Sequence, residues 1–175
     1  MTHQRQVPRP RLRDVIRLAL VGVLAALLTL GAGPARAASS GHVSTIDEAT
    51  HQMTVTDNGR TVMTFAVGFG KLSFRTPSGT FHVLGKDAVV QMTSCSARIT
   101  CDPHSPNYYS LTVHWAVRLT NAGVFVHAAP WDHSIGRADT SHGCIHLSTA
   151  DARRFYDFSR VGDTVIVKHT GSSGR

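Results

Sequence analysis

The sequence predicts a mainly β domain with one helix near its C-terminal end. Short segments in which apolar and polar residues alternate recur from residue 42 onward, and this period of two is typical of half-buried strands. Asp57-Asn58-Gly59-Arg60 lies between two such segments and indicates a two-residue hairpin turn. Only the stretch after Ser148 has the apolar spacing of a helix.

The expected strands begin as a meander and continue as shorter segments. Their ranges are 42–47, 52–56, 61–67, 80–84, 111–119, 124–127 and 164–168, with one more short strand directly after Cys144. Residues 69–79 are rich in turn formers, so we expect a loop there.

The segment 85–109 fits neither period. It is polar, it contains prolines and two cysteines, and its only apolar run is Val89-Val90. We expect a long loop or a hairpin beside a functional groove, because structureless segments of this length in compact domains are usually functional.

The helix is expected to begin at Ser148. Ser148 and Asp151 have the spacing of a capping box, which satisfies backbone N–H groups of the first turn. Ala152, Phe155 and Phe158 then fall on one helical face, and we expect that face to lie in the core.

Charge and length limit the classes of function. The chain has 175 residues, enough for one domain with its own core. Its formal net charge is +7, but six of the 18 Lys+Arg and one of the 11 Asp+Glu lie in residues 1–37. The remainder carries 12 minus 10, or +2. We therefore expect no nucleic-acid partner.

Residues 1–37 have the three parts of a secretory signal peptide. Arginines precede a nearly continuous apolar stretch at 18–30, and Ala35-Arg36-Ala37 places small residues at both positions that define cleavage. We expect cleavage after Ala37, a domain at 38–170 and a disordered tail at 171–175. An uncleaved membrane anchor is the alternative, but the apolar run is short for a bilayer.

Export would change the expected state of the three cysteines. Outside the cytoplasm Cys95 and Cys101 can form a disulfide, which leaves Cys144 as a free thiol and points to reactivity. Alternatively, Cys95 and Cys101 are two free apolar side chains, because spacing does not establish disulfide geometry.

A candidate nucleophile lies in the run Thr140-Ser141-His142-Gly143-Cys144-Ile145-His146. A free thiol is only a few per cent thiolate at neutral pH, and a neighbouring imidazole is the usual means of activating it. His127, at the end of an apolar run, is the candidate base. Gly143 allows a tight turn whose amide groups could stabilise an oxyanion. A buried structural cysteine is the alternative, and the clustering of these residues argues against it.

Cysteine and histidine are also residue types that bind zinc, and this group contains Cys144, His127, His142 and His146. Their spacing matches no common zinc pattern, so we expect no metal.

The motif resembles the signature of the L,D-transpeptidase (YkuD-type) catalytic domain, in which a histidine and a loop precede Ser-His-Gly-Cys. His127 and Ser141-His142-Gly143-Cys144 carry the resemblance, and further matching segments cover nearly everything after the leader. These are Thr50-His51-Gln52, Asn58-Gly59, residues 76–81, residues 124–131, residues 155–158 and Gly162-Asp163. One departure is His146, where the family usually has Asn or Arg.

The resemblance implies a β-sandwich or barrel-like fold with one C-terminal helix and a lid loop over the active site. The segment 85–109 would be the lid, and residues 69–79 a loop beside the site. Met92 and Tyr109 would line the groove, although both could instead pack under the lid.

By the same resemblance the chain is expected to be an exported cysteine acyltransferase of the periplasm or cell wall. It would cross-link peptidoglycan by L,D-transpeptidation of stem tetrapeptides through a Cys144 thioester. His127 would be the general base, oriented by the backbone carbonyl of Ala128, and the amides of His142, Gly143 and Cys144 would hold the oxyanion. Peptidoglycan stem peptides would be donor and acceptor, carbapenems would acylate Cys144, and the enzyme would be a monomer without a cofactor.

Three more residues are expected at the substrate site, each with an alternative role. The Ser141 hydroxyl contacts substrate or only bonds to backbone. Trp131 contacts substrate or anchors its loop. His146 adds a second donor and a titrating charge if it faces the groove, or fills space if it points away.

Two other functions remain open from the sequence. One is an exported thiol L,D-carboxypeptidase or hydrolase on the same scaffold, with water in place of the acceptor amine. The other is a non-catalytic wall-binding module, which would be expected to lack the nucleophile or the base. Both of these residues are present here.

Overall fold

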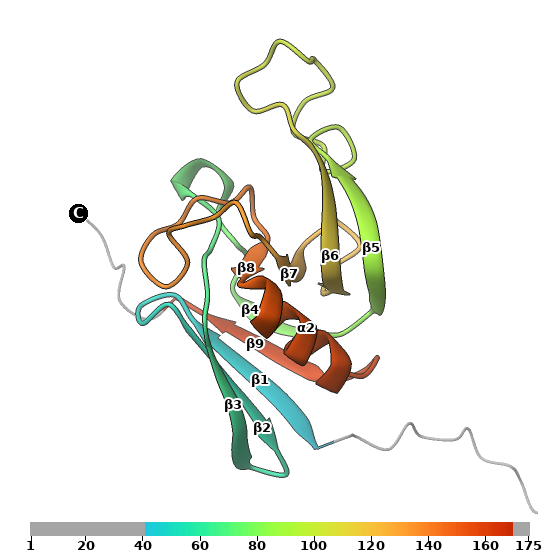
Figure 1. Ribbon diagram of the computed structural model, residues 1–175. Coiled ribbons are helices and arrows are strands. Elements are labelled where there is room, and N and C mark those ends of the chain that lie inside the picture. Colours follow the sequence, from blue (N-terminus) through green and yellow to red (C-terminus); the bar gives the residue numbers. More distant parts are fainter. Residues whose placement is uncertain (1–40, 170–175) are drawn as a thin grey trace, which may run out of the picture. The chain divides into compact units, whose positions relative to one another are not determined.

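The computed structural model describes residues 41–169, which form two β-sheets and one α-helix (Figure 1). The first sheet has the strand order β3-β2-β1-β9-β4, with β3 (Arg60–Ala66), β2 (Gln52–Asp57), β1 (His42–Asp47), β9 (Thr164–Lys168) and β4 (Gly79–His82). The second has the order β5-β6-β7-β8, with β5 (Gly85–Thr93), β6 (Ser110–Arg118), β7 (Phe125–Ala128) and β8 (Ile145–Leu147). The helix is α2 (Thr149–Phe158), and η1 (Leu72–Phe74) is a short 3-10 turn. The predicted signal peptide and the tail at 171–175 lie outside the described residues.

The first sheet begins with the predicted meander. β1 pairs antiparallel with β2, and β2 with β3. The turn between β2 and β3 has positive φ at Asn58 (49°) and Gly59 (80°), the backbone that a two-residue hairpin requires. β9, the last strand of the described residues, lies between β1 and β4, parallel to β1 and antiparallel to β4.

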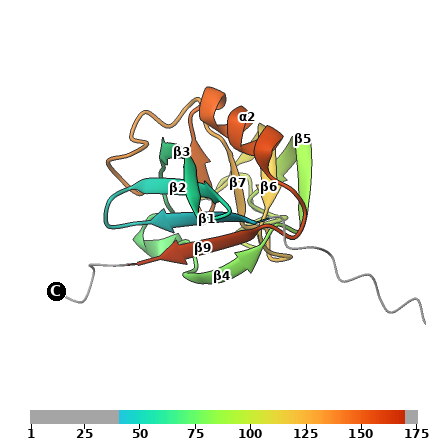
Figure 2. The ribbon, with the colours of Figure 1, turned by 90° about the horizontal axis from the view of Figure 1, so that it is seen from below.

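One hydrophobic core joins both sheets to the helix. Its buried side chains come from the first sheet, such as Ile46 and Val165, from the second sheet, such as Val117 and Val126, and from the helix. Figure 2 shows α2 beside the strands of the second sheet, and it packs against β6, β7 and β8. The helix therefore covers apolar surface that neither sheet buries alone.

The predicted start and apolar face of the helix are confirmed. The Ser148 hydroxyl accepts a hydrogen bond from the Asp151 backbone N–H at 3.1 Å. Ala152 and Phe155 are buried, and Phe158 packs partly buried against the same core.

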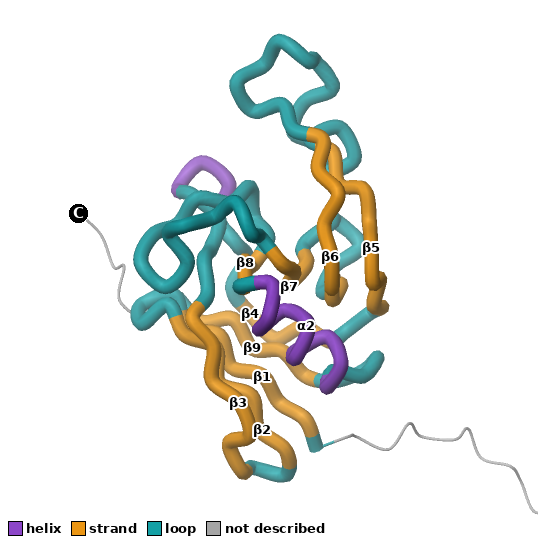
Figure 3. Tube along the Cα trace, viewed as in Figure 1, coloured by secondary structure: helices purple, strands orange, loops and turns teal. Residues whose placement is uncertain are grey.

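The segment 85–109, expected as a long loop or a hairpin, forms the first strand of a hairpin and the connection to its second strand. β5 and β6 pair antiparallel over most of their length, and the connection between them extends away from the sheets (Figures 1 and 3). No residue of β5 is fully buried, so the strand has little apolar pattern in the sequence beyond Val89-Val90. The strand therefore depends on its pairing with β6, and the local sequence pattern does not predict it.

Candidate active site

A cavity of about 650 Å³ lies between the β5–β6 hairpin, the end of β7 and the loop before β8. Its lining includes every residue that the sequence placed at the catalytic or substrate site. These are Cys144, His127, His142, Gly143, Tyr109, Met92, Ser141, His146 and Trp131. The fold thus brings together residues that are up to 54 positions apart in the sequence, from Met92 to His146.

The turn that carries Cys144 is held by Ser141. The buried Ser141 hydroxyl donates to the Cys144 carbonyl at 2.6 Å and accepts the Gly143 N–H at 3.0 Å. Gly143 has φ +115°, a conformation that side chains rarely adopt. Of the two roles expected for Ser141, the bond to backbone is therefore present in the structure.

The Gly143 amide, expected in the oxyanion site, has a hydrogen-bond partner within this turn. Its N–H already donates to the Ser141 hydroxyl, so an oxyanion would have to compete with that bond. Within residues 41–169 the N–H groups of His142 and Cys144 have no such partner. These two amides are the donors left for an oxyanion.

His127 lies on β7 with its ring orientation fixed. Its side chain is 3% exposed, and Nδ1–H donates to the Ala128 carbonyl at 2.8 Å, the orienting bond that the resemblance implied. Since that bond assigns the proton to Nδ1, Nε2 is left as the proton acceptor. Burial, with a smaller contribution from nearby His146, lowers the pKa of His127 to about 4, although the Ala128 bond opposes the shift.

Cys144 is a protonated thiol at neutral pH. Burial raises its pKa to about 11, partly offset by a hydrogen bond with the Phe125 backbone. The thiol contacts the Gly123 carbonyl at 3.6 Å, and no hydrogen bond joins it to His127 in the part of the chain described. Contacts of this kind are often long before substrate binds. The resting pair is therefore a thiol and a neutral imidazole.

Cys144, His127 and His146 line the same cavity. β7 and β8 run parallel, with His127 opposite His146. Cys144 lies directly before β8, at the end of the turn that leads into this strand. Of the two orientations considered for His146, the one facing the groove is present.

His146 pairs with Asp132, a residue for which the sequence suggested no role. Nδ1 of His146 lies 2.7 Å from the Asp132 carboxylate, and both side chains are under 10% exposed. The imidazole rings of His146 and His127 lie with their centroids 5.0 Å apart. Burial lowers the pKa of His146, and Asp132 opposes that shift without cancelling it.

His142 lies in an aromatic setting. Its ring centroid is 5.0 Å from that of Phe74 and 5.2 Å from that of Tyr109. Its buried Nε2 has no hydrogen-bond partner among the residues described. Burial lowers the pKa of His142, and Lys71 and His146 lower it further. The Tyr109 pKa is raised by burial and then by Cys144. Both rings therefore form an uncharged wall of the cavity.

Trp131 lies at the rim. It is 41% exposed, and its ring centroid is 6.2 Å from those of His127 and His146. It thus contacts both imidazoles while keeping one side open to solvent. A substrate contact and a packing role are both compatible with this position.

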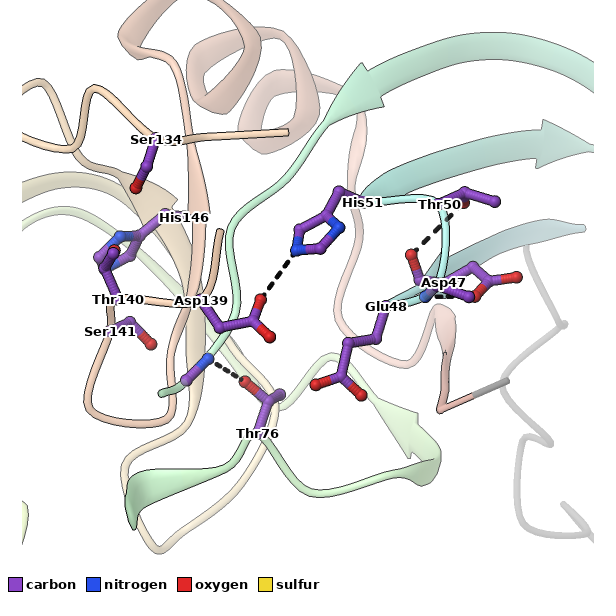
Figure 4. Close-up of polar contacts among 12 residues, drawn as sticks. Asp47, Glu48, Thr50, His51, Thr76, Ser134, Asp139, Thr140, Ser141 and His146 are labelled. Atoms are coloured by element: carbon purple, nitrogen blue, oxygen red, sulfur yellow. Dashed lines mark hydrogen bonds and ion pairs between the residues drawn. The ribbon is translucent and has the colours of Figure 1, made fainter. Parts of the chain in front are cut away.

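The loop after β3 packs against the turn that carries Cys144. A Cβ on Gly70 would lie 2.1 Å from the Phe74 carbonyl and 2.9 Å from the Gly143 Cα, so only glycine fits. The Gly70 N–H donates to the Thr76 hydroxyl at 2.9 Å, a contact drawn in Figure 4. The sequence indicated a loop here, but not that the loop touches the turn.

Cys95 and Cys101 are joined by a disulfide in the connection between β5 and β6. Cys144 is the free cysteine.

Comparison with known proteins decides the family. The model of the L,D-transpeptidase catalytic domain, YkuD, matches residues 41–167. The chain belongs to this family. L,D-transpeptidase 1 of Mycobacterium tuberculosis is 43% identical over 118 residues, which are 67% of this chain and 46% of that protein. The L,D-transpeptidase domain described here thus spans about half the length of this curated relative.

Solved structures agree with the L,D-transpeptidase fold. An L,D-transpeptidase from Mycobacterium smegmatis superposes with a TM-score of 0.70 at 42% identity, covering 73% of this chain and 58% of that one. The L,D-transpeptidase LdtMt1, solved in complex with imipenem, gives a TM-score of 0.70 at 40% identity, covering 73% and 59%. The predicted mainly β fold with one helix is confirmed. That the β5–β6 hairpin acts as a lid stays a prediction.

Proposed function

We propose that this chain is an exported, monomeric L,D-transpeptidase that cross-links peptidoglycan through a thioester on Cys144. The observation that carries the proposal is that its free cysteine and His127 line the same cavity. His127 has its Nδ1–H held by Ala128, so Nε2 is available to take a proton. Membership of the family supports the same reaction.

In the acylation half-reaction His127 Nε2 takes the thiol proton while sulfur attacks the carbonyl of the donor peptide. The high pKa of Cys144 and the low pKa of His127 mean that this transfer accompanies attack and does not precede it. Amide N–H groups of Cys144 and His142 receive the developing oxyanion. His127 then returns the proton to the departing amine of a D-amino acid.

In the second half-reaction the acceptor amine attacks the thioester carbon and displaces the Cys144 sulfur. The donor is a stem tetrapeptide, cleaved between its diamino acid and terminal D-Ala, and the acceptor is the side-chain amine of a neighbouring stem. The tetrahedral intermediate collapses with release of sulfur, and His127 carries a proton from the new amide nitrogen to the thiolate. The cavity, lined by Met92, Tyr109 and Trp131, is large enough for part of a peptide.

Mass spectrometry of the products separates transfer from hydrolysis. Incubation with a tetrapeptide donor and an acceptor stem should give a cross-linked dimer, and Cys144→Ala should give none. A tripeptide alone, with no dimer at any acceptor concentration, would assign the chain to the hydrolase class instead.

Export is supported by the pattern of residues 1–37 and by the Cys95–Cys101 disulfide, since disulfides persist in oxidising compartments. The mature protein would begin at Ala38 and act in the periplasm or cell wall. N-terminal sequencing of protein recovered outside the cytoplasm tests this, and a retained Met1 would favour an anchor.

A further inference from the structure

The Asp132 carboxylate is saturated with hydrogen bonds. Oδ1 accepts from the Ser134 backbone N–H at 2.9 Å and from the Ser134 hydroxyl, while Oδ2 accepts from the Thr140 hydroxyl at 2.9 Å and from His146 Nδ1 at 2.7 Å. In Figure 4 Thr140 lies next to His146. Burial alone would raise the Asp132 pKa, but these hydrogen bonds outweigh it and hold the carboxyl ionised.

The bond to Asp132 fixes the tautomer and direction of His146. Because Nδ1 donates to the carboxylate, Nε2 is left as a proton acceptor, and it has no hydrogen-bond partner within residues 41–169. His146 lines the cavity, so this nitrogen belongs to a side chain that a bound molecule can reach. A buried carboxylate and an imidazole in this arrangement form a proton-accepting dyad.

The cavity therefore holds two imidazoles with different partners. His127 donates to a neutral carbonyl, and His146 donates to an anionic carboxylate. A nearby negative charge favours the protonated form of a histidine, so of the two His146 is better able to keep a proton. Their rings lie 5.0 Å apart, close enough to serve one bound substrate.

In the second half-reaction of the proposed function the acceptor amine gives up two protons, and only one of them has been assigned to His127. A side-chain amine is an ammonium ion at neutral pH, and its nitrogen has no lone pair for attack. It must lose one proton before it attacks the thioester carbon. It loses a second when the carbon–sulfur bond breaks, and His127 passes that one to sulfur.

We propose that His146, oriented by Asp132, accepts the first of these protons and so selects an amine over water as the acceptor. The inference rests on the proposed function. His146 Nε2 takes the proton from the ammonium, the freed amine attacks, and the imidazolium returns its proton to solvent after the amide has formed. Asp132 is a positioning residue that holds the imidazole and stabilises its charge.

Other groups near His146 do not replace it in this role. His127 on β7 carries the proton exchanged with sulfur, and Cys144 is the nucleophile itself. Burial first, and then the nearby charges of Lys71 and His146, lower the pKa of His142 and so disfavour its protonation. The Gly68 segment packed against β8 brings only backbone hydrogen bonds to His146.

Two acceptors that differ in amine basicity test the proposal. Thioester is formed from a tetrapeptide donor, and transfer is then measured to a stem-peptide amine and to hydroxylamine, which is already neutral near pH 7. His146→Asn and Asp132→Asn should lower transfer to the stem amine by about tenfold or more relative to transfer to hydroxylamine. The loss of transfer to the stem amine should become smaller as pH rises, because more of the acceptor is then already deprotonated. His114→Asn and Asp157→Asn, both at exposed positions, are the matched controls.

The outcomes separate this inference from the proposed function. An equal fall for both acceptors would mean that the dyad only shapes the cavity, and an unchanged rate for both would mean that it has no role. Either result overturns the inference while leaving thioester chemistry intact. Failure of the wild-type protein to form any thioester would instead refute the proposed function. If His146→Asn does not fold, the comparison in Asp132→Asn and the pH profiles of the wild type with each acceptor decide.

Discussion

At the level of single residues, the hydrogen-bond partner of each side chain determines its role in proton transfer. His127 and His146 lie opposite each other in adjacent strands, yet one donates to a carbonyl and the other to a carboxylate. Cys144 has a raised pKa because burial is not offset by a neighbouring cation. In the proposed reaction its reactivity therefore depends on proton transfer to His127 during attack.

Replacement of that base should slow acylation. His127→Ala removes the imidazole that we propose as the acceptor of the thiol proton, so we expect the rate of acylation at neutral pH to fall by about a hundredfold or more. Stopped-flow or time-resolved mass spectrometry with a β-lactam measures this rate. The loss should narrow at alkaline pH, where hydroxide generates thiolate without a base. A rate within a few-fold of the wild type at pH 7 would exclude His127 as the base.

At the scale of elements, the parallel pair β7–β8 and the loop after β3 build the site. The strand pair sets which side chains share a face, and the loop holds the turn that carries Cys144. Lys71 N–H donates to the Ser141 carbonyl and Ser141 N–H to the Phe69 carbonyl, both at 3.0 Å. The cysteine turn is thus fixed by backbone bonds to a segment 70 residues earlier in the chain.

Gly70→Ala should therefore damage the site more than the fold. The new methyl group would overlap the Phe74 carbonyl and push against Gly143, displacing the Cys144 turn. We expect acylation to fall at least tenfold and the free energy of unfolding to fall by roughly 1–3 kcal/mol, as in other overpacked positions. Gly85→Ala is the control, because its methyl group would meet only the flexible end of Arg118. Equal activity in the two variants would contradict this role for Gly70.

The disulfide in the β5–β6 connection should contribute modest stability. Closing so short a loop gives about 2 kcal/mol in the chain-entropy account. The double variant Cys95→Ala, Cys101→Ala should therefore unfold at a lower urea concentration while still forming an adduct on Cys144. Non-reducing peptide mapping of exported protein checks the bond itself. Two alkylatable thiols in that peptide would contradict it.

The elements best predicted from sequence are those whose pattern is local. The hairpin at Asn58-Gly59 and the helix cap at Ser148 depend on a few adjacent residues, and both are confirmed. β5 was not resolved from a loop because its exposed residues carry no alternation, and it forms through pairing with β6. Asp132 was missed for a related reason. Its pairing with His146 exists only after the loop folds back on β8.

At the scale of the whole molecule, one core supports a site made of buried titratable groups. Burial keeps His127 neutral in the folded state, with a pKa of about 4 against an ordinary value of 6.5. Between pH 4 and pH 6.5 the unfolded state therefore binds more protons than the folded state. The stabilising contribution is complete above pH 6.5 and is lost as pH falls through 4.

Acid should thus destabilise the fold in a way that depends on His127. From the two pKa values, protonation of the unfolded state removes on the order of 3 kcal/mol between pH 6.5 and 4. His127→Gln should have a shallower decline in unfolding free energy over this range, measured by urea titration at several pH values. His114→Gln, at an exposed position, should follow the wild type. Parallel curves for His127→Gln and the wild type would show that His127 is not held neutral by the fold.

We propose that Cys144 is the nucleophile of acyl transfer in this cavity. Intact-mass spectrometry after exposure to a carbapenem tests it most directly, since a related L,D-transpeptidase has been solved in complex with imipenem. We predict a single covalent adduct that maps to Cys144, and none in Cys144→Ala. A wild-type protein that stays unmodified, or an adduct that persists in Cys144→Ala, would contradict the account.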